Sequence, residues 1–207
     1  MNMGGRAAAQ FFIKSKARGG MELGAVTRNF YHFEFRGDVG LHLPDGSIKR
    51  VERHVEIIEN LTTTEGRTNA LQQYFKGSGY SAAWYMALIS NTAFGALAVG
   101  DTAAKITTST PSSPTTNDWA ESTGYSESTR PAITFGTAAS ASIDSSAAPS
   151  TFTINTTVSL YGGFLITNST KGGTTGLIYG EGAFSTVVSL GSGSVVTVYV
   201  TLTLANV

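Results

Sequence analysis

The stretch VVTVYVTLTL, residues 195–204 near the C-terminal end, carries the clearest structural pattern in the chain. From Val196 to Leu204 every second residue is aliphatic, and the positions between them are mostly threonine. This alternation is typical of a β-strand that turns one face to a core and the other face outward. We therefore expect a strand near 194–204, within a β-rich domain.

Runs of similar composition precede this strand and are separated from it and from one another by turn signals. The sequences KGG at 171–173 and GSG at 191–193 mark two of these turns. Short strands at this spacing favour a β-sandwich, either immunoglobulin-like or jelly-roll-like. We predict that it covers residues 80–207, with strands near 82–89, 132–136, 150–155, 158–167, 176–184 and 194–204.

A smaller element is predicted in front of the sandwich, over residues 29–79. Strands at 30–36 and 49–58 flank Pro44-Asp45-Gly46, which is a strong turn signal, so the two strands are expected to form a β-hairpin. A short helix is expected to follow at 69–75, where apolar residues recur at helical spacing and a threonine upstream can cap it. The predicted apolar face of this helix consists of Ala70, Leu71, Tyr74 and Phe75.

Two segments have the composition of arms or loops. The region near 105–118 is rich in Ser, Thr and Pro, and a loop of this length in a compact domain is commonly functional or disordered. Residues 1–28 are predicted to form a basic, extended arm, because residues 1–20 contain four cations and no acid. We expect this arm to help fix the protein to a partner through Phe11, Phe12, Ile13, Lys14, Lys16 and Arg18.

Charge is scarce in this sequence. Charged residues make up 14% of the chain, against roughly 25% in a typical soluble domain. The only charged residues in the segment 131–207 are Asp144, Lys171 and Glu181. The chain has no cysteine, which excludes disulfides, thiolate metal sites and cysteine nucleophiles. We expect no signal peptide and no membrane contact.

No residue pattern predicts a catalytic, cofactor or metal site. His32, His42 and His54 could approach one another on paired strands, but they lack the spacing of zinc ligands. The chain has no Gly-x-Ser-x-Gly motif, and its Gly-rich run at 172–176 lacks the lysine of a phosphate-binding loop. With only four cations in the arm, we do not expect direct contact with DNA.

Paired carboxylates of the kind used in glycoside hydrolysis remain a weaker alternative. The candidates lie in the loop region between strands, where acidic residues also serve simply to keep a loop soluble. They are Asp101, Asp118, Glu121 and Glu127.

The chain resembles a family of small structural proteins of tailed-bacteriophage particles. The resemblance rests on the order and spacing of several strings over residues 29–204, and the basic arm lies outside it. These strings are ENLTTTEG at 59–66, NALQQYFKG at 69–77, AWYMALI at 83–89, GDT at 100–102, YSESTRP at 125–131, YGGFL at 161–165 and the turn at 171–176.

This resemblance implies a virion structural role without known catalysis. We expect a capsid decoration or cement protein, or another head-associated protein, that stabilises the virion. The alternative is a neck or tail/fibre component that binds carbohydrate or a receptor through exposed aromatics such as Trp119, Tyr125 and Tyr179. A hydrolase is the third alternative for the function. The expected partners are further copies of the chain and the major capsid, portal or tail proteins, in a virion made in the bacterial cytoplasm.

Overall fold

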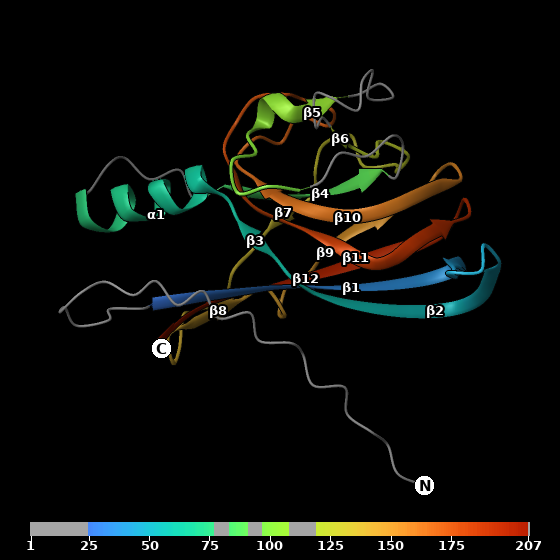
Figure 1. The fold of residues 1–207 in the computed structure, drawn as a ribbon, viewed down its shortest axis with the longest axis horizontal. Helices are drawn as coiled ribbons and strands as arrows, with labels where there is room; N and C mark the ends of the chain where they lie inside the picture. The colour runs from blue at the N-terminus through green and yellow to red at the C-terminus, as the bar shows by residue number, and fades with distance from the viewer. Residues whose placement is uncertain (1–24, 77–82, 91–96, 108–118, 207) are drawn as a thin grey trace, which may run out of the picture.

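The computed structural model describes residues 25–76, 83–90, 97–107 and 119–206. The protein is mainly β, as predicted, and the described residues contain one α-helix (Figure 1). The strands are β1 (Ala25–His42), β2 (Ile48–Glu59), β3 (Leu61–Thr62), β4 (Trp84–Ser90), β5 (Ile106–Thr107), β6 (Trp119–Ala120), β7 (Ala132–Ile133), β8 (Ser142–Asp144), β9 (Ser150–Thr153), β10 (Val158–Ile166), β11 (Ile178–Leu190) and β12 (Val195–Asn206). The helices are α1 (Thr64–Lys76) and a 3-10 turn at Ala103–Lys105.

The predicted hairpin is present as β1 and β2. Its turn forms where Pro44-Asp45-Gly46 indicated, and Gly46 adopts a φ of 83° that favours glycine. The Asp45 carboxylate accepts hydrogen bonds from the backbone and the hydroxyl of Ser47 and so closes the turn. Both strands extend beyond the predicted limits of 30–36 and 49–58.

The hairpin belongs to the same sheet as the C-terminal strands. Ten strands form one antiparallel sheet in the order β7-β4-β10-β11-β1-β12-β8, with β2 beside β1, β3 beside β11 and β9 beside β12. Strand β1 pairs with β12 from Ala25–Asn206 to Arg36–Val195, and further along it pairs with β11. The predicted hairpin unit and the predicted sandwich are therefore joined by backbone hydrogen bonds.

The sheet curls, and the segment between β6 and β7 connects its two ends. Next to β4, Glu121 forms an isolated bridge with Ile89, and the Met86 N–H donates to the Pro131 carbonyl. Next to β9, Tyr125 forms a bridge with Ile154. The result is a curled, sandwich-like half-barrel whose open side is crossed by residues 121–131.

The main core fills the inside of the curl. The alternation in β12 places Val196, Val198 and Val200 there, each fully buried, as the pattern predicted. Side chains from β1, β4, β10 and β11 face them. The core residues from these four strands are Tyr31, Phe33, Phe35, Val39, Trp84, Met86, Leu88, Leu160, Leu165, Phe184, Val188 and Leu190.

A second, smaller core covers the outer face of β4 and β10. Ala87 and Ile89 point into it, between the residues of β4 that enter the main core. Trp119, the first residue of β6, packs edge-on against Phe164 at 4.8 Å between ring centroids, and its backbone pairs with Ile106 of β5. Tyr161 is partly buried at the margin of this second core.

Close backbone approach explains Gly162 in β10. A Cβ on Gly162 would lie 2.0 Å from the carbonyl oxygen of Gly182 on β11. The β10–β11 register shifts between Leu160 and Gly162, and the backbones of the two strands approach each other at this point. A side chain is therefore excluded here by contact with backbone.

The helix α1 begins earlier than predicted, at Thr64, and Thr63 caps it by accepting a hydrogen bond from the Gly66 N–H. The predicted apolar face is wrong in its first half, because Ala70 and Leu71 are exposed. The helix instead meets the sheet at Gly66, where a Cβ would lie 2.3 Å from the Tyr179 carbonyl oxygen. The side chains of the other two predicted face residues lie outside the described ones. No helix in the described part of the chain is long and apolar enough to span a membrane.

Candidate functional site

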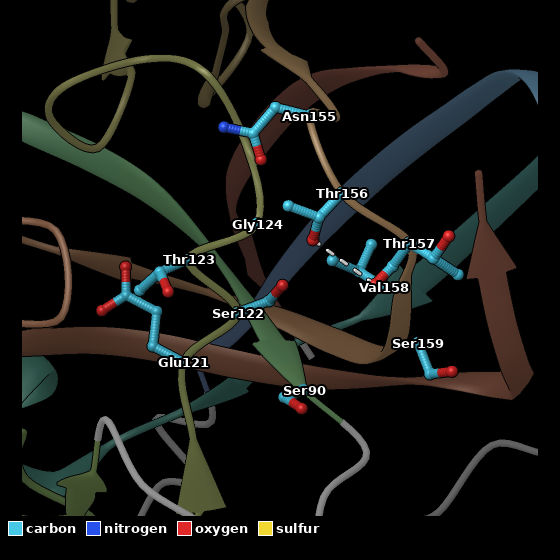
Figure 2. A pocket seen from close by; sticks show the side chains of 10 residues that line it. All are labelled: Ser90, Glu121, Ser122, Thr123, Gly124, Asn155, Thr156, Thr157, Val158 and Ser159. Carbon is cyan, nitrogen blue, oxygen red and sulfur yellow. Dashed lines mark hydrogen bonds between the residues drawn. The ribbon is translucent and has the colours of Figure 1, made fainter. Parts of the chain in front are cut away.

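A polar pocket opens where the crossing segment meets the turn between β9 and β10 (Figure 2). Its volume is about 520 Å³. The Asn155 N–H donates to the Gly124 carbonyl and holds the two walls together. Hydroxyl groups dominate the lining, which consists of Ser90, Glu121, Ser122, Thr123, Gly124, Asn155, Thr156, Thr157, Val158 and Ser159.

Glu121 is the only ionisable residue in this lining, and its carboxylate is directed away from Thr157 and Ser159. Figure 2 shows the carboxylate on the opposite side of the chain from Thr157 and Ser159. It forms a bidentate ion pair with Arg130, at 2.6 Å from Nη2 to Oε2 and 3.0 Å from Nε to Oε1. Both side chains are completely buried.

The remaining hydrogen-bonding capacity of this pair is used to join two loops. Arg130 donates from Nη1 to the Asn168 carbonyl at 2.8 Å and from Nη2 to the Gly173 carbonyl at 2.7 Å. The Gly172 N–H donates to Glu121 Oε2 at 2.9 Å. The pair therefore ties the crossing segment to the turn between β10 and β11.

Lys171 strengthens the same connection from the other side. Its ammonium group donates to the carbonyl oxygens of Tyr125 at 2.7 Å and Glu127 at 2.9 Å, and it lies 4.0 Å from the centre of the Tyr125 ring. We call Glu121, Tyr125, Arg130 and Lys171, with the carbonyl and N–H groups they hold, the loop clamp.

The electrostatic properties of the loop clamp are those of an ion pair that stabilises the fold. Burial raises the pKa of the Glu121 carboxyl, and the hydrogen bonds and charge of Arg130 act in the opposite direction. Four of the five N–H donors of Arg130 are used by its carboxylate and carbonyl partners, and its side chain is completely buried, so it does not present an anion-binding group to solvent. The clamp can hold two loops together, and removing either charge would leave the other buried without a partner.

A second buried acidic group lies under the 97–107 segment. Glu181, on β11, accepts a hydrogen bond from the Ala98 N–H at 3.1 Å and is completely buried. Asp101 accepts from the Trp119 indole N–H at 3.2 Å and from the same Ala98 N–H. We call Asp101 and Glu181 the acid pair.

The surroundings of Glu181 favour the protonated form of its carboxyl. Burial, and then the neighbouring Asp101 charge, raise the pKa of Glu181 to about 9. A protonated Glu181 carboxyl can donate a hydrogen bond to Asp101. The acid pair thereby fixes the 97–107 segment and Trp119 against β11.

Three of the four carboxylates considered for hydrolysis lie within the described residues, and each of them has different partners. Asp101 belongs to the acid pair and Glu121 to the loop clamp. Glu127 accepts hydrogen bonds from the Thr153 N–H, and Asp118 lies outside the described residues.

The three histidines are also separated. The His32 ring contacts the Tyr199 ring at a tilted angle, whereas His54 stacks against Phe35 on the opposite face of the sheet. His42 lies near the turn of the hairpin, with Nε2 2.6 Å from the Ser189 hydroxyl. Within the described ranges, no group of three metal-ligating side chains is close enough to hold an ion.

The aromatics proposed for a receptor site are not exposed, which corrects that expectation. Trp119 and Tyr125 are completely buried. Tyr179 is partly buried and packs edge-on against Trp84. The residues predicted as assembly contacts, Phe11 to Arg18, lie outside the described residues.

Sequence reasoning missed both the loop clamp and the acid pair. The sequence did contain one indication of these clusters. Only three charged residues occur in 131–207, and two of them, Lys171 and Glu181, belong to the loop clamp and the acid pair. A charge kept in a segment that otherwise lacks charge marks a specific buried role. Periodicity could not show which partners these side chains have, because the partners are distant in sequence.

Comparison with known proteins gives no relative, since no family model, no curated protein and no solved structure matches the chain.

Proposed function

We propose that the protein is a non-enzymatic structural component of a tailed-bacteriophage particle, acting as a capsid decoration, cement or other head-associated protein. The loop clamp is the observation that carries this proposal. Two of the strings behind the sequence resemblance, 125–131 and 171–176, lie far apart in the chain and are joined by it. These sequence strings, each of which is weak evidence for the resemblance on its own, thus belong to one connected structural unit.

The use of the buried acids supports the same role. Asp101, Glu121 and Glu181 are the most deeply buried carboxylates among the described residues, and each one fixes a loop. Strongly perturbed groups can mark an active site, but they occur equally in structural ion-pair networks. Here their partners are backbone groups, an indole and an arginine, which favours stability of the particle component over catalysis.

The outward face of β1 and β12 suits contact with other proteins. Phe30, His32, Thr197, Tyr199 and Thr201 are neighbours on this face, and all are partly exposed. They present hydroxyl and aromatic groups beside a charged cluster in which Arg36 and Arg53 bind Glu34. A broad face of this composition is typical of surfaces that end against another protein.

A neck or tail/fibre component that binds carbohydrate is the second candidate. The pocket in Figure 2 favours it, because hydroxyl and amide groups can hydrogen-bond to a sugar. The pocket's lining contains no aromatic residue for a sugar ring to stack on. Binding to a glycan array, lost on replacing Asn155 and Thr156 by alanine, would support this candidate over the first.

Mass spectrometry of purified particles tests the primary proposal. We expect the protein in particles that have been separated from free protein by density, in a constant ratio to the major capsid protein. Its absence from particles that contain all their other structural proteins would refute the proposal. Turnover of a host polysaccharide by the isolated protein would instead establish the hydrolase.

A further inference from the structure

Two arginines converge on one buried carboxylate on the outward face of the sheet. Arg36, on β1, donates from Nε at 2.9 Å and from Nη2 at 2.7 Å to Glu34 Oε1. Arg53, on β2, donates from Nε to the same oxygen at 2.7 Å. The Glu34 side chain is 9% exposed, whereas each arginine side chain is 64% exposed. We call these three residues the arginine cluster.

A β-bulge fixes the backbone beside this cluster. The register of β1 and β2 shifts directly after the point at which Arg36 and Arg53 are paired. Gly37 adopts a φ of 110°, which favours glycine, and a Cβ there would lie 2.9 Å from Ser194 Oγ. The Asp38 N–H donates to that same oxygen at 3.1 Å. Bulges can redirect a side chain next to a binding site, and this one adjoins the two guanidinium groups.

Both guanidinium groups keep donors that the protein does not use. Each guanidinium has five N–H donors. Glu34 takes up two of them in Arg36 and one in Arg53, and within the described ranges no other acceptor contacts either side chain. The cluster contains two positive charges and one negative charge, so one positive charge remains. Two guanidinium groups that are held together, exposed and incompletely neutralised can bind an oxyanion.

Apolar side chains adjoin the arginine cluster on the same face. Val55 lies directly opposite Glu34 across the strands and is 38% exposed. Ile57 lies opposite His32 and is 63% exposed. An oxyanion bound by the arginines therefore lies next to exposed hydrocarbon. This combination fits a carboxylate on an apolar stem better than nucleic acid, whose row of phosphates is bound through many cations.

We propose that the arginine cluster binds a carboxylate of a partner protein, supplied by an acidic side chain that has apolar neighbours. The free N–H groups of Arg36 and Arg53 form charge-assisted hydrogen bonds to this carboxylate, whose planar shape matches the guanidinium group. Glu34 is a positioning residue, because it holds both arginines before the partner arrives. Side chains that are ordered in advance lose less conformational freedom on binding.

This inference deepens the proposed function. It rests on contact between the outward face and other virion proteins, and it adds the chemistry of that contact. The two can nevertheless fail separately. Presence of the protein in purified particles tests the virion role, whereas carboxylate binding is a property of the isolated full chain.

Titration of the isotope-labelled full chain with sodium hexanoate, followed by NMR at constant ionic strength, tests the site. We expect saturable shifts of the Nε–H signals of Arg36 and Arg53. Arg53→Gln should weaken binding by about tenfold or more, because it removes charge-assisted hydrogen bonds. Arg50→Gln is the matched control with the same change of charge, since Arg50 forms an exposed pair with Asp38 on the same hairpin. Shifts that do not saturate, or equal affinities of the two variants, would overturn the proposal.

Two further ligands test the kind of partner. Acetate has the same carboxylate without the apolar stem and should bind several-fold more weakly than hexanoate. Val55→Thr, a change of similar shape at an exposed site, should reduce this difference and leave the affinity for acetate unchanged. Inorganic phosphate should also bind more weakly than hexanoate at about pH 5.5, where both are mainly singly charged. Equal affinity for hexanoate and acetate, or tighter binding of phosphate, would overturn the assignment to an acidic side chain with apolar neighbours.

Discussion

Arg130 and Glu121 form a bidentate ion pair in which neither side chain is exposed to solvent. Each also holds backbone groups of the turn between β10 and β11, so the pair connects two loops that are 38 to 51 residues apart in the chain. The consequences of this arrangement can be measured.

Replacing Arg130 by methionine should lower the free energy of unfolding by about 3–5 kcal/mol, because it leaves the buried Glu121 carboxylate without its partner. Chemical denaturation measures this change. The matched control is Arg50→Met, since the Arg50–Asp38 pair has more than half of each side chain exposed. That variant should lose less than about 1 kcal/mol. Equal losses in the two variants would contradict a stabilising role for burial of the pair.

Glu181 should make the protein less stable as pH rises. Its pKa in the folded protein is about 9, above the ordinary carboxyl value of 4.5, so the folded state keeps a proton that the unfolded chain releases. Stability from this group is therefore complete below pH 4.5 and declines as pH rises to about 9.

Glu181→Gln removes this titration and keeps a neutral side chain of similar shape. Thermal unfolding from pH 5 to pH 9 should show a smaller decline for the variant than for the wild type. The comparison cancels the titration of other groups, which both proteins share. Parallel curves for the two proteins would show that Glu181 is not protonated in the folded state.

Gly162→Ala should destabilise the fold strongly, because the added Cβ would meet the Gly182 carbonyl at 2.0 Å. The neighbouring atoms are backbone and cannot rotate away. Gly100→Ala is the control, since a Cβ there has no neighbour within 4 Å and its backbone needs no positive φ. A drop in melting temperature restricted to Gly162→Ala is the expected result. Similar melting temperatures would mean that β10 and β11 are further apart than described.

Trp84→Ala should cost about 3–5 kcal/mol of folding stability, as expected for truncating a buried aromatic residue. Trp84 is 8% exposed and lies in the main core with Met86 and Leu88. Leu71→Ala, at a site 59% exposed on α1, is the control and should change stability little. If Trp84→Ala kept full stability and lost only ligand binding, a receptor-binding role would be favoured.

The sequence predicted those elements whose pattern is local. Alternation located β12, and Pro44-Asp45-Gly46 located the hairpin turn, because both depend on neighbouring residues. Strand β8 was missed, since Ser142–Asp144 is too short to show a period. The exposed face of α1 at Leu71 was also missed, because contact at Gly66 through bare backbone leaves no hydrophobic signal.

The site depended on contacts that sequence patterns cannot show. Glu121 was considered as a catalytic candidate in a loop, and only the fold brings Arg130 and Gly172 to it. Trp119 and Tyr125 were expected to be exposed because they lie in a polar loop region. Tyr125 is buried in the main core by the crossing segment, which covers the open side of the sheet, whereas Trp119 is buried in the second core on the outer face of β4 and β10.

Direct localisation in the intact particle is the measurement that tests the virion role most closely. The protein carrying a small C-terminal label should be incorporated, and averaged electron cryo-microscopy images should show the label at symmetry-related positions on the head. That result would establish both position and copy number. Particles of full infectivity that show no density for the label, from cells that make the labelled protein in normal amounts, would contradict the account.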